Sequence, residues 1–223
     1  MNNETSKDKR AHKRTPIFPS IGYSRLRMEN DGDGVTTLVC AQGCPLRCRY
    51  CLNPQSSLKK SNPPLRVFAP RELYELVKID DLYFVATSGG ITFGGGEPLL
   101  YIDFLEEFAT LAKRSGWKIY IESSLAISSH KVKRSAAFTD FYIVDVKDTN
   151  PRIYYDYTGA SNEGVLSNLK MLIGEVGADK IRVRLPLIPG CNTDKDRDKS
   201  EKLLREWGIT QIDRFTYRIP EKQ

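Results

Sequence analysis

Three cysteines lie within eight residues of one another, at Cys44, Cys48 and Cys51, in the spacing C-x3-C-x2-C. Thiolates this close in sequence can turn from one loop onto a shared iron–sulfur cluster. A 4Fe–4S cluster has four irons, so three thiolates leave one iron open to a substrate or cofactor. The spacing therefore predicts chemistry at an open iron rather than electron storage in a closed cluster.

Two other uses of these cysteines stay open. A structural zinc site needs four protein ligands, and Cys40 is near enough in sequence to be a fourth thiolate, but the chain has no second pair of the kind zinc knuckles use. Disulfide bonds suit small secreted domains, whereas this chain has five cysteines and no apolar signal segment in its first residues. A cluster is the favoured interpretation, and it leaves Cys40 and Cys191 unassigned.

Composition favours one domain with a substantial core. Hydrophobic residues make up 40% of the 223 residues, and no apolar run approaches the roughly 20 residues of a membrane helix. We expect a reduced, cytoplasmic setting, residues 1–30 as a basic extension that is poorly ordered at its start, and residues 31–223 as the domain. Part of the net charge of +6 lies in that extension; a nucleic-acid arm is the alternative to a solvated tail, which we favour.

Short strand-like runs alternate with helical patterns along the domain. The expected strands are 35–40, 90–93, 118–121, 141–144, 180–187 and 211–217. The expected helices are 70–77, 101–113, 129–137, 165–174 and 195–207. Such alternation indicates parallel βαβ units, and both an open doubly wound sheet and a barrel fit it.

The cysteine spacing, with Tyr50 directly before the last cysteine, resembles the radical S-adenosylmethionine (SAM) superfamily. The resemblance implies a partial (β/α)6 TIM-like barrel, with chemistry at the C-terminal ends of the strands. It also implies that three thiolates hold a 4Fe–4S cluster, while the amino and carboxylate groups of SAM chelate the fourth iron. Tyr50 is then a candidate cofactor contact.

A glycine string follows the second expected strand, and its consecutive glycines let backbone groups approach a ligand closely. A flexible turn is the alternative, but in this position Gly94, Gly95, Gly96 and Glu97 look like the superfamily's GGE motif. That likeness implies that the backbone around the glycines, together with Glu97, binds the methionyl amino group of SAM.

Polar residues follow the next strands. Glu122 and Ser124 end the third strand, where relatives place an acidic contact to the ribose hydroxyls. Asp145 and Lys147 lie two residues apart after the fourth strand, on one face of an extended segment. Two such residues usually form a solvated ion pair on the protein surface. In the fifth strand Arg184 is either an active-site residue or a structural arginine.

The Asp-x-Lys of the fourth strand and the R-x-x-x-x-P-G segment after Arg184 resemble glycyl radical enzyme activases of the pyruvate formate-lyase activating type. A segment at Asp31–Gly34 is a distorted version of the Asp-Gly-Pro-Gly that precedes the cysteines in those enzymes. The likeness implies that Lys147 reaches the SAM carboxylate. It also implies that Asp145, with the acidic residue after the third strand, helps to hold a monovalent cation.

The function implied is reductive cleavage of SAM to a 5′-deoxyadenosyl radical that installs a glycyl radical on a partner enzyme. Flavodoxin or ferredoxin would supply the electron, and no membrane or nucleic-acid partner is expected. The alternatives are a radical SAM enzyme acting on a ribosomal peptide, one acting on a small molecule like 7-carboxy-7-deazaguanine synthase, and a non-catalytic iron–sulfur or zinc protein.

Overall fold

A computed structural model describes residues 14–57 and 63–217, and the strands of this part form one sheet in the order β3-β1-β2-β4-β5-β6-β7-β8. The strands are β1 (Phe18–Met28), β2 (Val35–Ala41), β3 (Arg66–Phe68), β4 (Gly90–Gly94), β5 (Lys118–Ser123), β6 (Phe141–Asp145), β7 (Ile181–Leu187) and β8 (Gln211–Thr216). The helices are α1 (Pro70–Val77), α2 (Asp81–Thr87), α3 (Ile102–Arg114), α4 (Ser129–Ala136), α5 (Pro151–Thr158), α6 (Glu163–Val176) and α7 (Asp194–Glu206).

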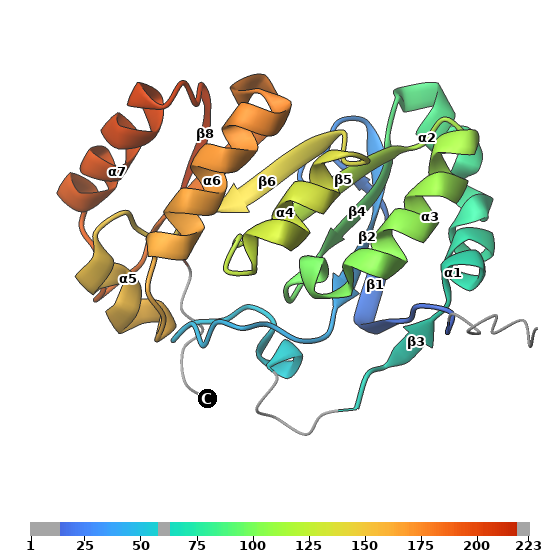
Figure 1. Ribbon diagram of the computed structural model, residues 1–223, viewed down its shortest axis with the longest axis horizontal. Coiled ribbons are helices and arrows are strands. Elements are labelled where there is room, and N and C mark those ends of the chain that lie inside the picture. Colours follow the sequence, from blue (N-terminus) through green and yellow to red (C-terminus); the bar gives the residue numbers. More distant parts are fainter. Residues whose placement is uncertain (1–13, 58–62, 218–223) are drawn as a thin grey trace, which may run out of the picture.

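Six of the strands, β2 and β4 to β8, are parallel and neighbour one another in chain order. A doubly wound sheet reverses its strand order at a switch point, which places helices on both faces. Consecutive order with crossovers of one hand keeps the helices on one face instead, and α3, α4 and α6 lie side by side over the sheet in Figure 1. The expected partial (β/α)6 barrel is therefore confirmed.

The expected strands and helices agree closely with the observed ones, and α1 matches at both ends. Among the strands and α-helices of the described residues, β1, β3, α2 and α5 were missed. The sequence of α5 carries three tyrosines in eight residues and reads as a loop. Its helical signal lies before it, where the side chain of Asn150 accepts hydrogen bonds from the backbone N–H groups of Arg152 and Ile153.

Strand β1 lies within the segment that we expected to be an extension. It pairs antiparallel with β2, from Ser20 opposite Ala41 to Met28 opposite Val35. The ring of Phe18 is fully buried, with its centroid 5.4 Å from that of Phe93 and 5.1 Å from that of Phe104. The folded unit therefore includes β1. The start of the expected extension, residues 1–13, lies outside the described residues.

Buried strands form the centre of the structure. All five residues of β4 are buried, as is usual for a parallel strand covered on both faces. The outward face packs on an aromatic group from α3, where Phe104 and Phe108 meet Phe93. Among the described residues, no helix combines the length and the apolar character needed to cross a bilayer.

Replacing Phe18 with alanine tests whether β1 belongs to the folded unit. We expect Phe18→Ala to lower the free energy of unfolding by about 3–5 kcal/mol, because it leaves a cavity among packed aromatic rings. The neighbouring side chain of Ile17 is exposed, so Ile17→Ala is a matched control and should change stability by less than about 0.5 kcal/mol. Anaerobic denaturant unfolding of the cluster-free protein measures both, and equal small effects would place β1 outside the cooperative unit.

Candidate active site

A cavity of about 400 Å³ opens where the parallel strands end. Its lining comes from β1, β2, β5, β6 and β7, from the loops after β1, β2, β4, β5 and β6, and from Tyr217 after β8. Its volume lies within the range of about 300–1,000 Å³ that is usual for ligand sites. Strand ends converge at this edge because all six parallel strands point toward it. The cavity is thus the place where residues far apart in sequence meet.

The three cysteines of the C-x3-C-x2-C loop all line this cavity. Burial raises the pKa of the Cys44 thiol to about 12, and the neighbouring Cys48 and Cys51 thiols add to the rise. Burial likewise raises the pKa of Cys48 to about 11. Metals bind the thiolate form, so loading of iron must release these protons.

The other two cysteines have different surroundings. Cys40 also lines the cavity, from β2, and burial raises its pKa to about 11. The charged groups that act on Cys40 are Glu122, Arg27 and Asp31 rather than the cysteine loop. Cys191, in the loop after β7, lies 3.9 Å from the guanidinium of Arg49 and outside the cavity.

The spread of the thiols suits a cluster. Within the described ranges, no three His, Cys, Asp or Glu side chains converge closely enough to hold a single metal ion. A cluster takes one thiolate on each of several irons, so its ligands need to surround a volume rather than a point. Three thiols around one cavity fit that requirement.

The glycine loop after β4 lies directly against the cysteine loop. Gly95 has φ +85°, and a Cβ there would come within 2.6 Å of the Cβ of Cys40. A Cβ on Gly96 would lie 2.2 Å from the carbonyl oxygen of Gly43. The N–H of Gly96 donates to the carbonyl of Ala41 at 3.1 Å. Only glycine permits this approach, and both Gly95 and Gly96 line the cavity.

Glu97 lies behind the glycine loop and does not line the cavity. Its carboxylate is fully buried and accepts hydrogen bonds from the hydroxyls of Ser123 at 2.8 Å and Ser124 at 2.9 Å. Burial raises its pKa, and the serine hydrogen bonds oppose that rise. In this structure Glu97 therefore ties the glycine loop to the end of β5. Its direct contact with SAM stays a prediction, as does that of Ser124, which lines the cavity.

Asp145 and Lys147 form an ion pair inside the cavity, with Nζ 3.0 Å from Oδ2. The Lys147 side chain is only 7% exposed, so the pair is not a solvated surface pair. Burial acts to lower the pKa of Lys147, but Asp145 and the hydroxyl of Tyr217 hold it well above its usual value. Lys147 is thus a fixed positive charge that faces the cysteine loop.

A second ion pair, between Glu122 and Arg184, lies in the same cavity. Burial raises the pKa of Glu122, and the guanidinium of Arg184 opposes the rise. Arg184 also donates to the carbonyl of Asn30 at 2.8 Å, which joins β7 to the loop between β1 and β2 across the barrel. Arg184 is therefore both a cavity residue and a structural link, the two roles that its sequence position left open.

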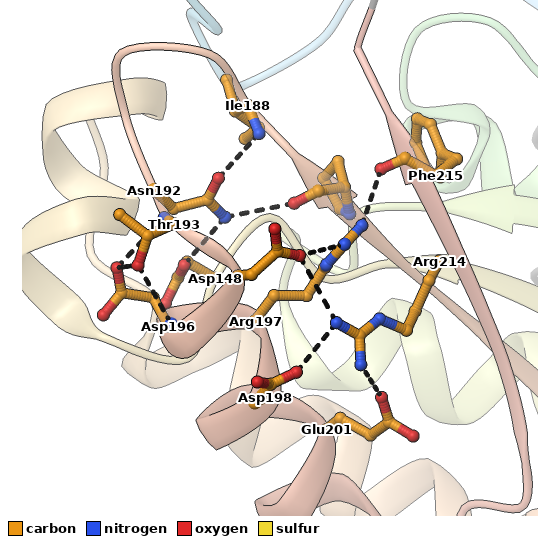
Figure 2. A network of polar contacts seen from close by, with 12 residues as sticks. Asp148, Ile188, Asn192, Thr193, Asp196, Arg197, Asp198, Glu201, Arg214 and Phe215 are labelled. Carbon is orange, nitrogen blue, oxygen red and sulfur yellow. Dashed lines mark hydrogen bonds and ion pairs between the residues drawn. The ribbon is translucent and has the colours of Figure 1, made fainter.

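The loop after β7 is held by a polar network around Asn192 (Figure 2). The Asn192 side chain accepts from the N–H of Ile188 at 2.7 Å and donates to Asp148 at 3.1 Å. Arg197 of α7 donates to the carbonyl of Phe215 in β8 at 3.2 Å. The network thus fixes the ends of β6 and β8, which present Lys147 and Tyr217 to the cavity.

The structure places two of the expected cofactor contacts outside the cavity, and sequence reasoning missed several residues that line it. Tyr50 packs on Tyr157, with ring centroids 6.4 Å apart, and Gly94 ends β4 beneath the carboxylate of Glu122; neither lines the cavity. Residues not proposed from the sequence that do line it are Arg27, Asn30, Asp31, Leu38, Cys40, Leu46, Leu52, Asn53, Ser123 and Tyr217. The position of Tyr217 at a strand end was a usable signal, whereas Arg27 belongs to the unexpected strand β1.

Comparisons with known proteins agree with this geometry. Residues 38–204 match the family model of the radical SAM superfamily. A pyruvate formate-lyase-activating enzyme of Listeria monocytogenes is 31% identical over 84% of this chain and 77% of its own length. An indoleacetate decarboxylase activating enzyme of Tractidigestivibacter scatoligenes is 28% identical over 76% of this chain and 73% of its own. Among solved structures, anSMEcpe with bound AdoMet aligns with a TM-score of 0.57 at 19% identity, over 80% of this chain and 50% of that one, and shows the same fold.

Single cysteine variants test the ligand set. We expect Cys44→Ala, Cys48→Ala and Cys51→Ala each to abolish a stable cluster, because every one removes an iron ligand. Cys40→Ala, a change in the same cavity, and Cys191→Ala, a change outside it, should keep the cluster. Iron and sulfide content and visible absorbance after anaerobic reconstitution measure the difference. Loss of the cluster in Cys40→Ala would add Cys40 to the ligands, and a full cluster in Cys48→Ala would remove Cys48 from them.

Proposed function

The chain belongs to the radical SAM superfamily, and on this premise we propose that it cleaves SAM reductively and installs a glycyl radical on a partner enzyme. The observation that carries the proposal is the meeting of the three cysteines, the glycine loop and Lys147 on one cavity. Relatives named as activating enzymes, similar over most of this chain, support the choice of a glycyl target.

When bound, a 4Fe–4S cluster supplies the electron that breaks the C5′–S bond of SAM, which gives methionine and a 5′-deoxyadenosyl radical able to take a hydrogen atom from a glycine Cα. The protein contributes position and surroundings. Cys44, Cys48 and Cys51 would hold the cluster and leave one iron free to bind SAM. Such chemistry needs no general acid or base from the chain.

The polar residues of the cavity give SAM an orientation. Lys147, held charged in a buried position, binds the carboxylate of SAM. The backbone of Gly95 and Gly96 lies beside the cysteine loop and binds the methionyl amino group of SAM. The carboxylate of Glu122, oriented by Arg184, accepts hydrogen bonds from the ribose hydroxyls of SAM. A monovalent cation near Asp145 belongs to the same proposal, although Asp145 and Glu122 already bond to Lys147 and Arg184 in this structure.

Apolar residues of the cavity limit side reactions. Leu38, Leu46 and Leu52 line it beside the cysteines, and Leu46 is buried. A primary carbon radical abstracts hydrogen from close C–H or S–H donors, so a cavity that excludes competing donors protects the intended transfer. Leu52 is exposed and lies at the mouth, where a partner chain would cover it.

Removal of the buried lysine tests its contact with SAM. We expect Lys147→Ala to weaken SAM binding about 10- to 100-fold, because the loss of a charge-assisted hydrogen bond costs about 1.5–3 kcal/mol. Lys131→Ala is the control, since Lys131 donates to the carbonyl of Leu100 outside the cavity. Equilibrium binding of SAM to the cluster-loaded variants measures the effect, and iron content verifies that the cluster remains. Unchanged affinity in Lys147→Ala would make Lys147 a structural residue.

The decisive experiment for the function is anaerobic reconstitution with iron and sulfide, followed by dithionite and SAM. We expect 5′-deoxyadenosine to form, and a glycyl radical signal to appear by electron paramagnetic resonance when a cognate glycyl radical enzyme is present. Formation of 5′-deoxyadenosine with hydrogen transfer from a peptide, and none from such an enzyme, would replace the glycyl target with a peptide. A loaded cluster without any 5′-deoxyadenosine would contradict SAM cleavage itself.

A further inference from the structure

The proposed cleavage consumes one electron for each SAM, and the chain must receive that electron from outside. Of the five cysteines in the sequence, three form the loop of the proposed cluster, and Cys40 and Cys191 lie apart from each other in the fold. These 223 residues therefore offer no second thiol set that could relay electrons. The donor has to approach the cysteine loop itself, because electron transfer slows steeply with distance.

The outer side of the cysteine loop is open to such a donor. Cys51 is exposed, and the side chain of Leu52 next to it is 71% exposed. Two arginines between the cysteines, Arg47 and Arg49, are exposed as well. The surface next to the cluster site is thus exposed and carries the positive charges of these two arginines, so an electron donor could approach the site there.

The same loop is fixed to the end of α5. The N–H of Arg47 donates to the carbonyl of Thr158, and that of Arg49 to the carbonyl of Tyr157, both at 2.9 Å. The guanidinium of Arg49 also donates to the carbonyl of Asp156 at 3.2 Å. These hydrogen bonds therefore hold the loop against the end of the helix, and Figure 1 shows the two segments next to each other at the lower left.

Helix α5 adds a further cation to this surface. Arg152, Tyr155 and Asp156 share the outer face of the helix at spacings of three and four residues. The Arg152 side chain is 91% exposed and lies 3.9 Å from Asp156, which offsets one of the positive charges. We call Arg47, Arg49 and Arg152 the arginine face; its excess charge is positive, and the exposed Leu52 and Tyr155 offer apolar contacts.

We infer that the arginine face is the docking surface of an acidic one-electron carrier protein, an inference that rests on the proposed function. The carrier is oxidised by one electron, which passes by Cys51 to the cluster site and then to the sulfonium of SAM; no proton moves in this transfer. Complementary charge accelerates encounter between proteins. A small interface with few apolar contacts also releases the oxidised carrier quickly, as repeated turnover requires.

Charge reversal tests the inference. The test variant is Arg47→Glu with Arg152→Glu; Arg49 is left in place because it braces the end of α5. The matched control is Arg71→Glu with Arg114→Glu, which changes the charge equally on the exposed surfaces of α1 and α3, away from α5 in Figure 1. Arg152→Glu alone is a second variant that leaves the cysteine loop unchanged. Thermal unfolding and iron content establish that all are folded and loaded.

Reduced flavodoxin is the probe. Dithionite is the control reductant, because a small molecule does not need to dock on a protein surface. We expect the test variant to form 5′-deoxyadenosine normally with dithionite and at least about tenfold more slowly with flavodoxin at low salt. Direct titration of flavodoxin onto the protein should show the same loss of affinity, and the difference should shrink at about 0.5 M salt through screening. The control and the unmodified protein should behave alike.

Other outcomes would overturn the docking surface. Equal rates of flavodoxin-driven SAM cleavage in the test and control variants would overturn it. A loss of cleavage that also occurs with dithionite would overturn it as well, because it would assign these arginines to cluster or SAM binding. Normal flavodoxin-driven cleavage with loss of the glycyl radical alone would give the surface to the partner enzyme instead. Failure of the unmodified protein to cleave SAM with dithionite would contradict the proposed function and is thereby distinguished from all of these.

Discussion

The close contact between two loops is the constraint on which the site depends. The backbone that leaves β4 lies against the backbone that leaves β2, with the N–H of Glu97 2.7 Å from the carbonyl of Gly43. Asn53 adds a side-chain bond to the carbonyl of Gly95 at 3.1 Å. The parallel pairing of β2 and β4 thus places the proposed cluster ligands next to the proposed SAM-binding backbone, and the glycines make this proximity sterically possible.

Buried charge is the second feature of the cavity, and it is costly unless each charge has a partner. Lys147 and Asp145 satisfy each other, as do Arg184 and Glu122. A ligand carboxylate that approached Lys147 would share a cation already desolvated and held in place, so little reorganisation accompanies binding. The two pairs differ in their further contacts. Arg184 also joins opposite sides of the barrel through the carbonyl of Asn30, whereas Lys147 also donates to the hydroxyl of Tyr217 at 3.4 Å.

The sequence was sufficient for features that arise locally. The alternation of strands and helices predicted parallel βαβ units, and the family resemblance carried by the thiol spacing and the glycine string led to the barrel and to the residues at its strand ends. Features that depend on tertiary contacts were beyond it. The partners of Glu97 come from a different strand, so its fully buried position had no local signal. Strand β1 alternates poorly in its second half, where most residues are exposed, and only pairing with β2 shows that it belongs to the sheet.

Helix α5, which the sequence analysis missed, joins the interior of the site to its surface. On one side its Tyr157 donates to the carbonyl of Tyr50 at 3.1 Å and packs near Tyr217, the residue beside Lys147. On the other side it carries Arg152 of the arginine face. A carrier that docks there contacts the helix that supports both the cysteine loop and the lysine brace. In the proposed mechanism, electron delivery and cofactor placement both depend on this helix. Variants in its buried face would then disturb both, whereas variants of the exposed arginines would affect electron delivery alone.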